Sequence, residues 1–114
     1  MPLTRDEIQV IGDCLRAAAY GPFFPDWEFS ILFGLTRDEV AAFAEQWPVV
    51  LSDHEHLEVA VNNSINHLLY YPSKHREKWD DYISVDRPEL LRVFTKWREQ
   101  ATPDSTKGYF DRLM

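Results

Sequence analysis

The chain has 114 residues, of which 45% are hydrophobic and 14% aromatic, so it can form one packed domain spanning 1–114. No apolar run approaches the length of a membrane-spanning helix, and the N-terminus lacks the basic and apolar pattern of a signal peptide. The one cysteine, Cys14, cannot form an internal disulfide. We therefore expect a cytoplasmic protein that does not associate with membranes.

Charge is distributed unevenly along the chain, whose net charge is −7. Residues 1–73 hold eleven acidic residues against three arginines, whereas residues 74–114 hold nine basic residues against eight acidic ones. The acidic part would repel a phosphate backbone, so we expect no binding of nucleic acid. It would attract a basic partner protein, although the same charge also serves simply to keep a protein in solution.

The pentapeptide Leu-Thr-Arg-Asp-Glu occurs twice, at Leu3–Glu7 and Leu35–Glu39, and each copy has the features of a helix start. The threonine can accept a hydrogen bond from the N–H three residues on, and the glutamate can bond back to the threonine N–H. Two further starts are predicted at Ser52 and Asp86, each with a glutamate three positions later. Four such starts predict an all-α fold.

Prolines and glycines end the predicted helices. The result is a single compact bundle of about four main helices and one or two short ones, over residues 5–20, 27–33, 37–47, 53–70 and 87–100, with a further turn within 74–82. Asp26 is expected to cap the short second helix, and Gly34 to end it in the left-handed conformation. Residues 101–114 are expected to form a loop and a tail that is either docked or flexible.

The inward face of the last helix is expected to carry four apolar residues at helical spacing: Leu90, Leu91, Phe94 and Trp97. The most aromatic segment is GPFFPDWEF, residues 21–29, whose two prolines favour an ordered loop. Its aromatic side chains would belong to the core, and any that stays exposed would mark an interface.

The helix predicted over 53–70 contains three asparagines and a histidine near its middle: Asn62, Asn63, Asn66 and His67. Asparagine costs a helix about 0.5 kcal/mol relative to alanine, so these residues are kept for their side chains. They could form a hydrogen-bond network that ties this helix to the Gly21–Pro25 loop. Alternatively, they could form, together with Trp27, a polar pocket for a small ligand.

Motifs for catalysis and cofactor binding are missing from the sequence. There is no spacing of histidine, cysteine and carboxylates typical of a metal site, no activated nucleophile and no phosphate-binding glycine loop. Cys14 lies among apolar residues and is expected to be an inert core thiol. We therefore expect no catalytic residues, no metal and no cofactor.

The chain contains the short motifs GPFFPDWEF at 21–29, LFGL at 32–35, RDEV at 37–40, WP at 47–48 and AVNN at 60–63. Together these motifs resemble an uncharacterised family of short bacterial proteins, and this resemblance implies a helical fold without implying any chemistry.

A second resemblance concerns the surface. The pair Tyr70-Tyr71 before Pro72, on an acidic chain, is similar to the immunity proteins that neutralise nuclease colicins. In that family paired tyrosines and neighbouring acids bind a basic nuclease domain. The resemblance implies that Glu55, Glu58, Tyr70 and Tyr71 bind a partner.

These observations favour a non-enzymatic protein-interaction module, immunity- or antitoxin-like, that binds a basic partner through acidic helices and exposed aromatic residues. The alternative is a small-ligand-binding protein or enzyme, with a pocket between the Phe23–Trp27 loop and the Asn62–His67 helix face. A third option is that the helices build a homodimer.

Overall fold

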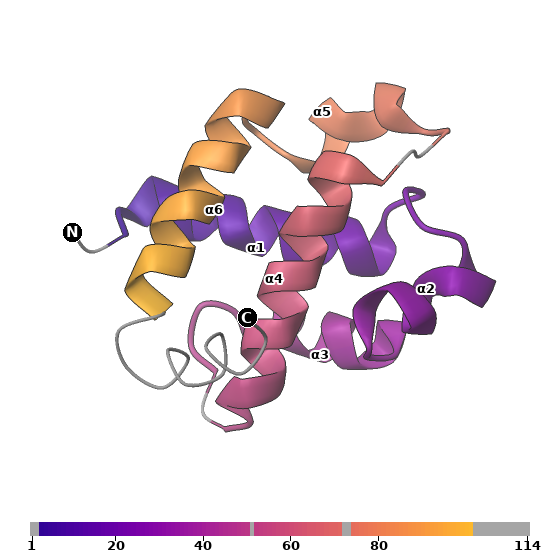
Figure 1. Cartoon of the computed structure of the whole chain (residues 1–114), viewed down its shortest axis with the longest axis horizontal. Helices are drawn as coiled ribbons and strands as arrows, with labels where there is room; N and C mark the ends of the chain where they lie inside the picture. The colour runs from indigo at the N-terminus through magenta and orange to yellow at the C-terminus, as the bar shows by residue number, and fades with distance from the viewer. Residues whose placement is uncertain (1–2, 51, 72–73, 102–114) are drawn as a thin grey trace.

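Helices account for all regular structure in the residues that the computed structural model describes, which are 3–50, 52–71 and 74–101 (Figure 1). They are α1 (Arg5–Tyr20), α2 (Asp26–Phe33), α3 (Arg37–Gln46), α4 (His54–Tyr70), α5 (Trp79–Tyr82) and α6 (Arg87–Ala101), with one 3₁₀ turn, η1 (Arg76–Lys78). The predicted all-α class, with four long helices and short ones between them, is confirmed. The loop and tail predicted for 101–114 lie, apart from the helical Ala101, outside the described residues.

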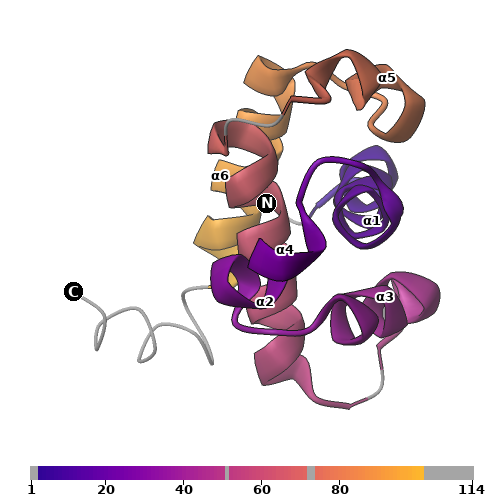
Figure 2. The same ribbon diagram turned by 90° about the vertical axis from the view of Figure 1, so that its right-hand side faces the viewer.

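The helices pack around α1, which contacts α3, α4, α5 and α6. In Figure 1, α1 runs across the molecule behind α4, with α6 on one side of α4 and with α2 and α3 on the other. Figure 2 shows α1 nearly end-on, beside α4 and above α3. The result is a compact globule in which α4 separates α2 from α6.

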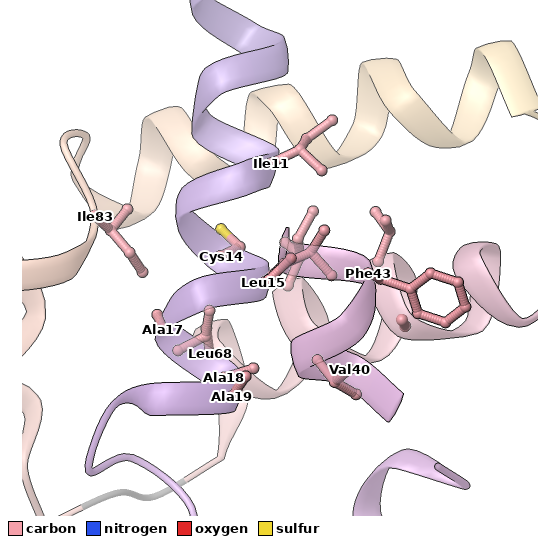
Figure 3. Packing of buried hydrophobic residues seen from close by; sticks show 14 of the residues in the cluster. Ile11, Cys14, Leu15, Ala17, Ala18, Ala19, Val40, Phe43, Leu68 and Ile83 are labelled. Atoms are coloured by element: carbon pink, nitrogen blue, oxygen red, sulfur yellow. The ribbon is translucent and has the colours of Figure 1, made fainter. Parts of the chain in front are cut away.

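The core is built on the apolar face of α1, whose Ile11, Cys14 and Leu15 are fully buried (Figure 3). Side chains from α3, from α4 and from the residue after α5 cover this face: Val40, Phe43, Leu68 and Ile83. Gly12 allows the end of α3 to come close, because a Cβ there would lie 2.7 Å from Cδ1 of Trp47. The Trp47 indole donates to the Ile8 carbonyl at 2.8 Å.

Three of the four predicted helix starts have the predicted capping chemistry. Thr4 and Thr36 each form a complete capping box with the glutamate three residues on. Asp86 accepts from the Glu89 N–H at 3.0 Å. The fourth start is at the predicted place but has a different structure. Asp53, not Ser52, precedes α4, in the left-handed region with φ 61°, and makes no side-chain capping bond.

Two further predictions were wrong in detail. Asp26 does not cap α2; it is the first residue of that helix, and its carboxylate pairs with Arg37 at 2.9 Å. Leu91 is not part of the inward face of α6, because 43% of it is exposed and Val93 is buried in its place. The buried stripe of α6 is therefore shifted around the helix relative to the prediction. Gly34, in contrast, ends α2 in the left-handed region as expected, with φ 69°.

None of the helices in the described parts of the chain has the length and apolar character that crossing a membrane requires.

Candidate functional site

Side chains on one face of α4, and the tyrosine that follows it, form hydrogen bonds to residues near both ends of α2. Asn63 donates to the Phe33 carbonyl at 2.7 Å, and the Tyr71 hydroxyl, just past α4, donates to Oε2 of Glu28 at 2.6 Å. Between them, Nε2 of His67 lies 2.8 Å from the Leu32 carbonyl, and since a carbonyl only accepts, this nitrogen carries the proton. These bonds place α2 antiparallel to the C-terminal half of α4 and satisfy the last carbonyls of α2.

The predicted asparagine–histidine network is therefore present, but it binds the end of α2 and not the Gly21–Pro25 loop. Asn62 joins it through a 3.1 Å bond to the Asn63 side chain, and Asn66 is half-buried on the same helix. The side chains that bond to α2 are occupied in holding the fold together.

A single arginine holds the loop that precedes α2. Arg37 donates to the carbonyls of Ala18 and Ala19 at the end of α1, at 3.1 and 3.2 Å, and to the Phe24 carbonyl at 2.8 Å. The same guanidinium lies 4.4 Å from the centre of the Phe29 ring. Arg37 thereby caps α1 and fixes both the loop and the start of α2.

The aromatic side chains of residues 21–29 divide into buried ones and one exposed one. Phe24 makes edge-on contacts with Phe29, Phe33 and Tyr71, at centroid distances of 6.4, 5.2 and 5.5 Å. Phe23 is buried as well, whereas Trp27 is 76% exposed. Trp27 is thus the residue of this segment that fits the prediction of an exposed interface aromatic.

A hollow of about 350 Å³ lies beside Trp27. Its lining is Pro22, Phe23, Pro25, Trp27, Glu28, Tyr71, Lys74 and His75. One wall is therefore the loop before α2 with the start of α2, as predicted. The other wall is the segment after α4, not the predicted Asn62–His67 face.

Two arginines position that second wall. Arg76 donates to the carbonyls of Leu68 and Tyr71, at 3.1 and 2.6 Å, and Arg87 donates to the Leu69 carbonyl. Together they satisfy the last carbonyls of α4. They keep Tyr71 and the start of the 74–78 segment against the helix end.

The outer side of α2 carries exposed apolar residues. Ile31 is 77% exposed and lies one turn after Trp27, so the two side chains project from the same side of the helix. The opposite side of α2 buries Phe29 and Phe33. An eight-residue helix that is apolar on both sides is typical of one that is covered on both sides.

The surface around α2 and α3 is acidic. Residues 20–50 contain five acidic residues and one basic residue, Arg37, whose guanidinium is turned inward as described above. Asp26 stands almost fully exposed at the start of α2. The carboxylates of Asp26 and Glu28 therefore lie next to the exposed apolar side of α2, with Lys74 and His75 on the other wall of the hollow.

The four predicted partner-binding residues do not form one patch. Glu55 is exposed and Glu58 half-buried near the start of α4, whereas Tyr70, 61% exposed, is its last residue. At 1.5 Å per helical residue, about 22 Å separates Glu55 from Tyr70. Tyr71 lies on the hollow, and its bond to Glu28 raises the pKa of its phenol.

Within the described ranges, no three histidine, cysteine, aspartate or glutamate side chains lie close enough together to hold a metal ion. Cys14 is fully buried, and this burial raises the pKa of its thiol.

No protein-family model, no curated protein sequence and no solved structure matches this chain. The two resemblances inferred from its motifs therefore remain predictions.

Proposed function

We propose that this chain is a non-enzymatic protein-interaction module, immunity- or antitoxin-like, whose binding surface consists of Trp27, Ile31 and the adjoining hollow. We call this surface the α2 face. The observation that carries the proposal is the exposure of two large apolar side chains, one turn apart, on a helix that already buries its other side. Tryptophan is among the residues most enriched at binding hot spots.

The α2 face is held rigidly from behind, which supports a role in binding. Arg37 fixes the loop, and Asn63, His67 and Tyr71 fix the helix. A surface that is already ordered loses little conformational entropy when a partner docks, so more of the contact energy appears as affinity.

The charge around the α2 face favours a basic partner over a second copy of the chain. Two copies docked through this face would bring the Asp26 and Glu28 carboxylates of each chain near those of the other, which is unfavourable. A basic protein would be attracted by the same residues and would associate faster at low salt.

The proposal can be tested by capture with the immobilised full chain from a lysate of the source organism. We expect a basic protein to be retained at low salt and to be released when Ile31→Glu replaces the wild type. Leu91→Glu is the control, because Leu91 is also an exposed apolar residue on a helix. Its helix, α6, lies on the other side of α4 from α2 (Figure 1). Retention that is equal for both variants, or insensitive to salt, would contradict the proposal.

The hollow supports small-ligand binding as a second candidate, since its volume of about 350 Å³ lies within the range of ligand sites. Two variants distinguish small-ligand binding from partner binding. Ile31 does not line the hollow, so Ile31→Glu would leave small-ligand binding unchanged, whereas Trp27→Ala would abolish it.

A further inference from the structure

We infer that the hollow receives an arginine side chain of the partner, with the guanidinium lying over Trp27 and pairing with the Glu28 carboxylate. This inference rests on the proposed function, since it names the chemical group through which the partner would be anchored. Trp27 and Glu28 are adjacent in sequence, and both line the hollow.

The molecule already contains the same combination of groups around α2. On the inner side of that helix, Arg37 lies 4.4 Å from the centre of the Phe29 ring and pairs with Asp26 at 2.9 Å. On the outer side, the hollow offers a larger aromatic ring and a second carboxylate. Tryptophan is the ring that attracts cations most strongly.

Glu28 is positioned to pair with such a group. The Tyr71 hydroxyl donates to its Oε2 at 2.6 Å and so fixes the carboxylate at the wall of the hollow. A carboxylate has about four acceptor positions, so one bond from tyrosine leaves others for a guanidinium. Arginine suits this site better than lysine, because its planar guanidinium can stack on an indole while it bonds a carboxylate.

The other lining residues also fit an arginine side chain. Pro22, Pro25 and Phe23 offer apolar surface to its methylene stem. Lys74 and His75 carry basic groups on the same lining, so the hollow is not uniformly negative. Lys74 therefore opposes a bound cation, and Lys74→Gln should strengthen the binding of arginine.

The test uses N-acetyl-arginine methylamide as the probe and its citrulline equivalent, which has nearly the same shape without the charge, as the comparison. Binding to the full chain is followed by NMR through the indole N–H signal of Trp27, which Trp27→Phe identifies among the four tryptophans. The indole N–H groups of Trp47 and Trp79 donate to backbone carbonyls and serve as internal references.

We expect the arginine probe to bind about fivefold more tightly than the citrulline probe, which is the size of effect expected for a cation on an exposed aromatic ring. Glu28→Gln should lower this preference, because it removes the ion pair and leaves only the contact with the Trp27 ring. Glu45→Gln is the matched control: Glu45 also accepts a bond from a tyrosine, Tyr20, at 2.6 Å, but does not line the hollow. It should keep the preference.

Equal binding of the two probes, or an arginine preference that is unchanged in Glu28→Gln, would overturn the inference. Tighter binding of N-acetyl-glutamate methylamide that depends on Lys74 would overturn it in favour of an anionic ligand. These failures are distinct from failure of the proposed function, which is decided by whether capture of a protein depends on Ile31.

Discussion

The helices α1 and α2 use apolar residues in opposite ways. Helix α1 has sixteen residues, begins with a complete capping box and places its large apolar side chains against the core. Helix α2 has eight residues, begins without a side-chain cap and exposes two of its largest apolar side chains. Helix α1 is part of the scaffold, and its apolar residues are explained by packing in the core. Helix α2 is held in place by neighbouring residues, and its exposed apolar residues are not explained by packing in the described fold.

This difference bears on function. Apolar residues that contribute to folding are buried, and the exposed ones on α2 contribute little to folding. Exposed apolar residues that lie together on one surface are typical of binding sites, and this is the basis of the proposed function. In solution, substitutions in α1 and α2 should therefore have very different effects on stability.

The largest effect is expected from Leu15→Ala in the fully buried face of α1. It should lower the free energy of unfolding by about 3 kcal/mol, because it removes apolar contacts and leaves a cavity. Ile31→Ala on α2 should change it by less than about 0.5 kcal/mol, as is usual for surface positions. Chemical denaturation measures both, and a similar loss for the two variants would contradict the contrast between the helices.

A smaller effect is expected from Asn63→Ala, which removes the donor to the Phe33 carbonyl. Because that carbonyl ends α2 and loses its partner, unfolding should become easier by about 1.5 kcal/mol. Amide exchange should accelerate first in α2. The control is Asn66→Ala on the same helix, since the described residues show no bond from Asn66 to α2. If exchange in α2 responded equally to both variants, α4 would not be what holds α2.

The smallest effect concerns pH and the start of α1. Lys96, bonded at 2.8 Å, and the Thr4 N–H together lower the pKa of Glu7 from 4.5 to about 2, and Arg92 pairs with it at 3.0 Å. A lowered carboxyl pKa stabilises the fold above pH 4.5, and this contribution is lost as the pH falls from 4.5 towards 2. The effect is reduced by solvent, because Arg92 is half exposed.

Denaturation measured between pH 2 and pH 7 should therefore show a shallower acid dependence for Glu7→Gln than for the wild type. Glu39→Gln makes the same change in the capping box of α3, where the amide oxygen can still accept from the Thr36 N–H, and is the control for loss of a capping-box charge alone. An unchanged acid limb in Glu7→Gln would show that the contacts to Lys96 and Arg92 do not persist in solution.

The features of the fold that depend only on residues close together in the sequence could be predicted from it. Thr4, Thr36 and Asp86 start helices because a short polar side chain and the following N–H groups suffice to make the cap. Asp26 was wrongly predicted to cap α2, because in the folded chain its carboxylate pairs with Arg37, eleven positions later. Leu91 was misplaced because the side of a helix that is buried depends on which helices pack against it.

The candidate site could be predicted only in part, because some of its residues are close together in the sequence and others are brought to it by tertiary packing. Trp27 and the loop before α2 were identified from their own composition. Lys74 and His75 were missed, because only tertiary packing brings the segment after α4 against that loop. The separation of Glu55 from Tyr70, in contrast, could have been found in the sequence, since positions fifteen residues apart on one helix are already far from each other.

The buried thiol of Cys14 offers a way to observe binding without any label. It is the one cysteine in the chain, and burial keeps its pKa high, so an alkylating reagent reacts with it only when the core opens. The rate of alkylation in native buffer therefore measures how often α1 separates from its neighbours. A partner that binds only the closed protein divides this rate by one plus the ratio of the partner concentration to the dissociation constant.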